Sequence, residues 1–102
     1  MKIVYSRQAK EQLSSIKQYI ARDNNRAAIE YLLKIKSKIE ILGDYPYIGK
    51  INTTMNITTI RDFVVFGYKI IYKINTKTIT ILAIYKYVNF DEEQINIENS
   101  GA

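Results

Sequence analysis

The chain has 102 residues and a net charge of +5, and 47% of its residues are hydrophobic, which fits one globular domain and excludes wholesale disorder. It contains no cysteine and no histidine, which excludes a disulfide framework, a thiol nucleophile and the commonest metal ligands and neutral-pH bases. We therefore expect no cofactor, no metal and no small-molecule substrate. No apolar run could span a bilayer, and the N-terminal hydrophobic run is too short for a secretory signal. We expect a cytoplasmic protein without a membrane partner.

The charge is distributed unevenly. Residues 1–90 hold all 15 lysines and arginines but only six of the ten acidic residues. The other four acidic residues are Asp91, Glu92, Glu93 and Glu98. We therefore divide the chain into a basic domain at 1–90 and an acidic C-terminal tail at 91–102. A basic body of this kind attracts a phosphate backbone or an acidic protein, although a lysine-rich solvated surface would have the same composition. A further hypothesis is that the tail folds back and shields the basic body.

The first half of the chain predicts one strand and two helices. Residues 2–6 are rich in branched and aromatic side chains, and Ser6 can cap a helix over residues 7–22. Turn residues at 23–25 follow, and Asn25 can cap a second helix. Gly43 is expected to end that helix as a left-handed cap residue. The apolar stripes of both helices recur at spacings of three and four: Ala9, Leu13, Ile16 and Ile20, then Ala28, Leu32, Ile35, Ile39 and Leu42.

The second half predicts strands at 56–61, 63–66, 67–75 and 78–87, with a hairpin connection at 75–77. In the third of these, four residues share one face, opposite the lysines: Tyr68, Ile70, Tyr72 and Ile74. We therefore expect an α+β fold in the order β-α-α-β-β-β, with an antiparallel-rich sheet and a two-helix hairpin packed on one of its faces.

Five segments follow one another along the chain: Ser6 before QAKEQLSSIKQYI, then AAIEYLLKIKSKIEIL, YPYIGK, IRDFVVFGYKIIYKI and ITILAIYKY. In this order they resemble the RelE/ParE superfamily of toxins from type II toxin–antitoxin systems. The resemblance covers roughly residues 2–87. It implies a growth-inhibiting toxin that a cognate antitoxin neutralises, by wrapping a segment around it. RelE-like members cut mRNA in the ribosome, whereas ParE-like members inhibit DNA gyrase, so the resemblance leaves two targets open.

The RelE-like alternative is a ribosome-dependent mRNA endoribonuclease that needs no metal. Such an enzyme requires side chains that transfer protons, and it also requires cationic side chains that stabilise a charged phosphorane. Four residues match the positions that such toxins use. Arg61 stands at the start of the strand block, and Lys69 follows the tyrosine of the Gly-Tyr strand. Lys86 and Tyr87 stand at the end of the last strand. These four are the candidate catalytic residues if the protein is a nuclease.

The sequence also departs from the nuclease pattern. Between Gly49 and Arg61 it offers only Lys50 where RelE-like nucleases often carry several lysines, and the last strand lacks their Arg- or His-rich ending. A lysine base would also need a strongly lowered pKa. The candidates have structural alternatives: Arg61 in an ion pair with Asp62 or with a helix carboxylate, Lys69 as a solvated strand lysine, and Tyr87 packed on the body. We therefore favour the ParE-like branch, a gyrase inhibitor without hydrolytic activity.

Overall fold

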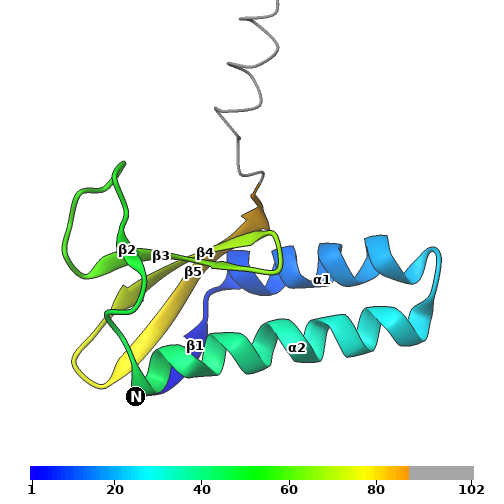
Figure 1. The fold of residues 1–102 in the computed structure, drawn as a ribbon, viewed down its shortest axis with the longest axis horizontal. Coiled ribbons are helices and arrows are strands. Elements are labelled where there is room, and N and C mark those ends of the chain that lie inside the picture. The colour runs from blue at the N-terminus through cyan, green and yellow to red at the C-terminus, as the bar shows by residue number, and fades with distance from the viewer. Residues whose placement is uncertain (88–102) are drawn as a thin grey trace, which may run out of the picture.

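The computed structural model describes residues 1–87, so the predicted acidic tail lies outside the described residues (Figure 1). The predicted α+β class and its β-α-α-β-β-β order are confirmed, with one additional two-residue strand. Within residues 1–87, neither helix is both long and apolar enough to cross a membrane. The elements are β1 (Lys2–Tyr5), α1 (Arg7–Ala21), α2 (Asn25–Asp44), β2 (Lys50–Ile51), β3 (Ile60–Val65), β4 (Tyr68–Ile74) and β5 (Thr78–Lys86).

The five strands form one sheet in the order β1-β5-β4-β3-β2. β1 pairs with β5 in parallel, and the other three pairings are antiparallel. The N-terminal strand therefore lies beside the last one, and the two long helices of the hairpin run between them in the chain (Figure 1). Because β1 and β5 run in the same direction, the chain begins at one end of the sheet and β5 finishes at the opposite end (Figure 1).

The helices begin at polar residues that accept hydrogen bonds from the first turn. The predicted cap at Ser6 is confirmed: its Oγ accepts from the backbone N–H of Ala9 at 3.0 Å. The same Oγ donates to the carbonyl of Leu82 at 2.9 Å, which fixes the start of α1 against β5. The prediction for α2 was wrong by one residue, because Asn24 rather than Asn25 accepts the capping bond, from the N–H of Ala27.

The prediction that Gly43 ends α2 in a left-handed conformation was wrong. α2 continues through Gly43 to Asp44, and Gly43 has no positive φ. Its carbonyl accepts a hydrogen bond from the N-terminal amine of Met1 at 2.8 Å, and a Cβ on Gly43 would lie 2.5 Å from the Met1 carbonyl oxygen. Glycine is present here because the N-terminus passes against the helix, which local sequence does not reveal.

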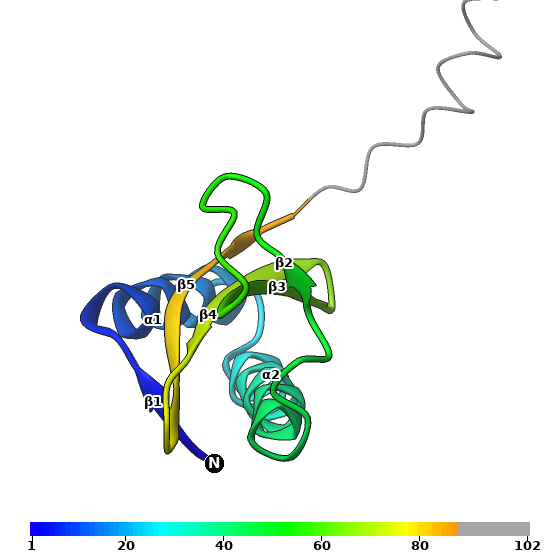
Figure 2. The same cartoon turned by 90° about the vertical axis from the view of Figure 1, so that its left-hand side faces the viewer.

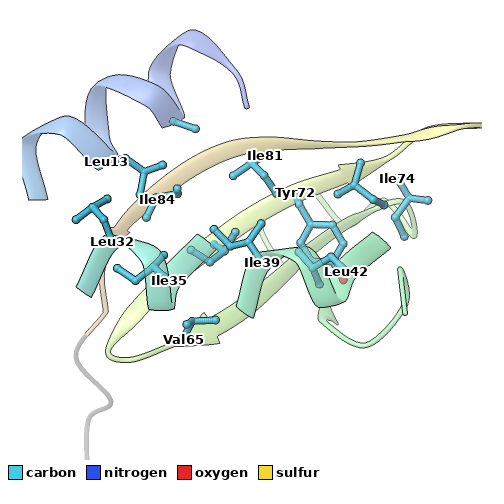
Figure 3. Packing of buried hydrophobic residues seen from close by; sticks show 13 residues of the cluster. Leu13, Leu32, Ile35, Ile39, Leu42, Val65, Tyr72, Ile74, Ile81 and Ile84 are labelled. Atoms are coloured by element: carbon cyan, nitrogen blue, oxygen red, sulfur yellow. The ribbon is translucent and has the colours of Figure 1, made fainter. Parts of the chain in front are cut away.

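Both helices pack on the same face of the sheet, as predicted (Figure 2). The predicted apolar stripes supply the helix side of the core, except that Ile20 is only half-buried and lies outside the buried cluster. Tyr72 is the largest fully buried side chain on the sheet side (Figure 3). Ile39 and Leu42 of α2 are completely buried against this sheet face. The buried cluster consists of Ala9, Leu13, Leu32, Ile35, Ile39, Leu42, Val65, Ile70, Tyr72, Ile74, Ile79, Ile81 and Ile84.

Simple alternation in the last strand predicts Ile79, Ile81, Ala83 and Tyr85 on one face and Ile84 on the other, and a β-bulge in β5 makes this prediction wrong. Ile71 pairs with Ala83 but the next residue, Tyr72, pairs with Ile81, so Leu82 is the extra residue on β5. An extra residue reverses the alternation of side chains beyond it. Ile84 therefore joins Ile81 in the core instead of facing away from it. The bulge places the end of β5, with Tyr85, on the open face.

The predicted strands at 56–61 and 63–66 are a single strand, β3, which starts only at Ile60. Residues 52–59 form a loop, although their Thr and Ile content favours a strand, because Asn52 ties it down. The buried Asn52 accepts a hydrogen bond from the N–H of Met55 and its carbonyl accepts one from the N–H of Asn56. These turn-type bonds compete with strand pairing.

The turn between β3 and β4 consists of Phe66 and Gly67, both with positive φ, at 49° and 79°. Two-residue hairpins favour this conformation, but a phenylalanine is strained in it. Tyr31 of α2 stabilises the turn, because its hydroxyl donates to the Phe66 carbonyl at 2.9 Å and its ring lies 6.1 Å from the Phe66 ring.

Replacing Phe66 with asparagine is therefore expected to raise the free energy of unfolding by about 1 kcal/mol, because asparagine tolerates positive φ. Phe66→Ala is the matched control, since it removes the ring but keeps the strain, and it is expected to destabilise. Urea denaturation of the three proteins measures both effects. A Phe66→Asn protein less stable than the parent would mean that ring packing outweighs backbone strain.

Tyr5 of β1 gives the fold an alkaline pH dependence. Burial, and secondarily the charge of Glu40, raises the pKa of Tyr5 from 10.0 to about 12. The unfolded chain releases this proton near pH 10 and the folded chain only near pH 12. The stabilisation that this pKa shift contributes is therefore fully present below pH 10 and is lost as the pH rises toward 12. Tyr5→Phe is expected to flatten the fall of the urea midpoint over this range relative to the parent, while Tyr45→Phe, at an exposed position, does not. Parallel curves for parent and Tyr5→Phe would contradict this.

Candidate functional site

The strand pairing separates the predicted site residues onto two faces of the sheet. Arg61 pairs with the buried Tyr72 and therefore lies on the face that carries the helices. Lys86 pairs with Tyr68, on that same side, and is exposed at the strand end. Lys69 pairs with Tyr85, on the open face. The structure thus brings Lys69 and Tyr87 together and leaves Arg61 and Lys86 apart from them.

Arg61 holds the segment that connects α2 to the sheet. Its Nη1 donates to the carbonyls of Gly49 at 3.0 Å and Tyr47 at 3.3 Å, and its Nε donates to the carbonyl of Thr58 at 2.9 Å. The guanidinium carbon also lies 4.9 Å from the centre of the Tyr47 ring, a cation–π contact. These carbonyls, rather than an ion pair with Asp62, are its partners, and they engage the donors of Nε and Nη1 out of the five that a guanidinium carries.

Tyr72 holds the same segment from inside the core. Its hydroxyl donates to the carbonyl of Pro46 at 2.6 Å and accepts a hydrogen bond from the N–H of Gly49 at 3.0 Å. Burial raises the pKa of this phenol, so it remains a neutral hydroxyl that can serve both partners. Residues 46–49 are therefore held by the Tyr72 hydroxyl from the core and by the Arg61 guanidinium from the surface. These contacts determine where the chain enters β2.

Lys69 lies between a carboxylate and an aromatic ring on the open face. Its Nζ is 3.8 Å from Oδ2 of Asp62 and 4.6 Å from the centre of the Tyr87 ring. The side chains of Lys69 and Asp62 are only 22% and 17% exposed, so water screens this ion pair less than a surface pair. Asn52 donates to the other oxygen of Asp62 at 2.7 Å and thereby fixes the carboxylate. Both neighbours of Lys69 attract a charged ammonium group.

A hollow of about 770 Å³ opens beside this ion pair. Lys50, which pairs with Asp62 across β2 and β3, supplies a second ammonium group to it. Three exposed aliphatic side chains, Ile48, Ile51 and Val64, also line it. We call this surface the open-face hollow. It combines positive charge with apolar area, a combination that suits a macromolecular partner better than a small charged ligand.

A second surface lies between the two helices. It is a groove of about 470 Å³ that we call the helix groove. Its apolar side chains include Ile29 and Leu33, which are 46% and 63% exposed. Lys10, Lys17 and Lys36 stand along it, and none of its described lining residues is acidic. An apolar groove bordered by lysines matches an amphipathic helix with acidic flanks.

Sequence reasoning missed Asp62 and Lys50 as parts of the open-face hollow, and Asn52 as the residue that fixes the Asp62 carboxylate. The alternation in IRDFVV was a usable signal for Asp62, because it places this residue on the face opposite Arg61. Asn52 and Lys50 carried no comparable signal, since their roles depend on the two-residue β2 and on the loop that follows it.

The structure is thus that of a small α+β protein with two candidate recognition surfaces, the open-face hollow and the helix groove. The family model described as "ParE toxin of type II toxin-antitoxin system, parDE" matches residues 3–86. The chain belongs to this family and is thus a toxin of the type II toxin–antitoxin class, a class that implies an antitoxin partner. The superfamily resemblance read from the sequence and its ParE-like branch are both confirmed.

The solved structure "Chromosomal ParDE TA system from P. aeruginosa" has a similar fold, with a TM-score of 0.72. Its sequence is 17% identical, and the match covers 86% of this chain and 97% of that one. At this identity the likeness concerns the fold alone. A search of curated proteins returned no match.

Proposed function

We propose that this protein inhibits bacterial growth by binding DNA gyrase, that it does not hydrolyse RNA, and that a cognate antitoxin neutralises it. The family membership supports a ParE-like target. The observation that carries the preference over RNA cleavage is the placement of the basic residues. Arg61 is bonded to three backbone carbonyls on one face, while Lys69 is paired with Asp62 on the other. Acid–base cleavage needs such groups to converge on one phosphate.

The antitoxin is proposed to occupy the helix groove. Exposed Ile29 and Leu33 supply apolar contacts, and the lysines beside them attract acidic flanks. The match in charge favours fast association and correct orientation, and the apolar floor supplies most of the affinity. An acidic, amphipathic segment of the antitoxin that folds on binding would fit both features.

A supercoiling assay tests the target. The purified protein, added to gyrase with relaxed plasmid and ATP, is expected to reduce supercoiling in a dose-dependent way. The same protein, added to ribosomes translating a defined mRNA, is expected to leave the transcript intact. Unimpaired supercoiling together with codon-linked mRNA cleavage would overturn the proposal in favour of the RelE-like alternative. In that event, Lys69→Ala and Arg61→Ala would be tested for loss of cleavage.

A charge placed in the helix groove tests the antitoxin site. Leu33→Glu puts a carboxylate on an exposed apolar position, so the fold is expected to remain intact while antitoxin binding falls at least tenfold. Gln18→Glu is the matched control, because it adds the same charge at an exposed position of α1 that does not line the groove. Co-purification with the cognate antitoxin measures the effect. Equal retention of both variants would place the antitoxin elsewhere.

A further inference from the structure

The open-face hollow lies where the described chain ends. Tyr87, the last described residue, lines the hollow, and its ring contacts the Lys69 ammonium group. Its backbone N–H donates to the carbonyl of Gly67 at 2.8 Å, which fixes the point from which the rest of the chain departs. The following segment, residues 88–102, therefore starts at the edge of this hollow.

The composition of residues 88–102 complements the hollow in two respects. The segment carries four carboxylates and no basic residue, whereas residues 1–87 carry a net charge of +9. It also contains three large apolar side chains, Phe90, Ile95 and Ile97, on either side of the acidic run at 91–93. The hollow offers the matching groups, two ammonium groups at Lys50 and Lys69 and a set of exposed aliphatic side chains.

The acidic run is within reach of the hollow. Asp91 stands four residues after Tyr87, and four residues of extended chain span about 13 Å at roughly 3.3 Å per residue. Asp62 neutralises part of the Lys69 charge but leaves Lys50 available. Because the segment is covalently attached, its effective concentration at the hollow is on the order of millimolar, so weak complementary contacts suffice to hold it there.

We propose that residues 88–97 bind in cis over the open-face hollow, with the carboxylates at 91–93 facing Lys50 and Lys69 and the apolar side chains covering the aliphatic rim. The tail then competes with any anionic partner for this face of the sheet. Such competition is sensitive to salt, because ions screen the charged contacts. The inference goes beyond the proposed function and does not depend on the identity of the target.

A single spin label tests the contact directly in the full-length chain. The protein has no cysteine, so Asn96→Cys supplies the only thiol for labelling. The amide signals of Val64 and Lys69 are measured at low salt in the labelled, isotope-enriched protein, before and after the label is chemically reduced. With the active label, both signals are expected to have at most half of the intensity that they have after reduction. The amide of Leu33, in the helix groove, is expected to keep its intensity. Absence of broadening at Val64 and Lys69 would overturn the proposal.

Charge variants separate this contact from a general effect of net charge. Neutralising the run in the labelled chain with Asp91→Asn, Glu92→Gln and Glu93→Gln is expected to restore the Lys69 signal at least partly. The matched control makes the same change in net charge on the helical hairpin, with Asp23→Asn, Glu30→Gln and Glu40→Gln. This control is expected to leave the broadening unchanged. Equal restoration by both sets would contradict a local contact.

The second copy of the chain is the competing occupant. Mixing spin-labelled protein of natural isotopic abundance with unlabelled, isotope-enriched protein reports only contacts between copies. The proposal predicts no broadening in that mixture, and broadening there would overturn the cis arrangement. All of these measurements use the isolated protein, so the tail contact can fail while gyrase inhibition stands, and the reverse also holds.

Discussion

Gly49→Ala is expected to lower the free energy of unfolding by about 3 kcal/mol, the upper range for an overpacked interior site. A Cβ at this position would lie 2.5 Å from the carbonyl oxygen of Asp62 and 2.7 Å from the Tyr72 hydroxyl. The first of these atoms belongs to the backbone of β3, and the second belongs to a completely buried side chain whose hydroxyl makes two hydrogen bonds. The hydroxyl cannot move without straining its two hydrogen bonds to Pro46 and Gly49, and the carbonyl belongs to the strand that pairs with β2.

Urea denaturation of the variant measures this effect. Ile48→Ala, at an exposed position of the same turn, is the matched control and is expected to change stability by less than about 0.5 kcal/mol. A Gly49→Ala protein as stable as the control would mean that the turn is free to shift, and the close packing of β2 against Tyr72 would then be wrong.

Tyr72→Phe is expected to cost about 2 kcal/mol, because it removes one oxygen that serves two partners. The N–H of Gly49, a buried residue, would lose its acceptor, and the Pro46 carbonyl would lose its donor. The ring itself, completely buried, would remain in the core, so the loss reports the hydroxyl alone. The variant is also expected to loosen residues 46–49 and hence the edge of the open-face hollow.

Tyr45→Phe provides the comparison, since Tyr45 belongs to the same connection but is 64% exposed. Thermal or urea unfolding gives the difference in stability, and hydrogen exchange at the Gly49 amide reports the local effect. Exchange at this amide that is unchanged in Tyr72→Phe would contradict the role assigned to the phenol.

Local sequence patterns predicted most of the fold. The helices followed from stripes at spacings of three and four, and the face of β4 that enters the core followed from simple alternation. Two of the errors came from contacts between residues that are distant in the sequence. The N-terminus approaches Gly43, and the bulge at Leu82 exchanges the faces of β5. The loop at 52–59 avoids strand pairing because Asn52 bonds back to it.

The candidate site was less accessible to sequence reasoning. Arg61 and Lys69 are eight positions apart on neighbouring strands, and their separation onto two faces depends on the register of the β3–β4 hairpin. That register follows from the two-residue turn at Phe66 and Gly67, which the sequence prediction had placed within strands. Two of the three backbone carbonyls that Arg61 binds come from a segment more than ten residues away, and the residue types of that segment do not reveal that its carbonyls accept these bonds.

The most direct test of a gyrase-binding toxin without ribonuclease activity is the response of bacteria to its induction. Cells are sampled within minutes, and transcript ends are mapped while induction of the DNA-damage response is measured in parallel. The account predicts a DNA-damage response with full-length transcripts. Early codon-linked cuts in mRNA, with no DNA-damage response, would contradict it.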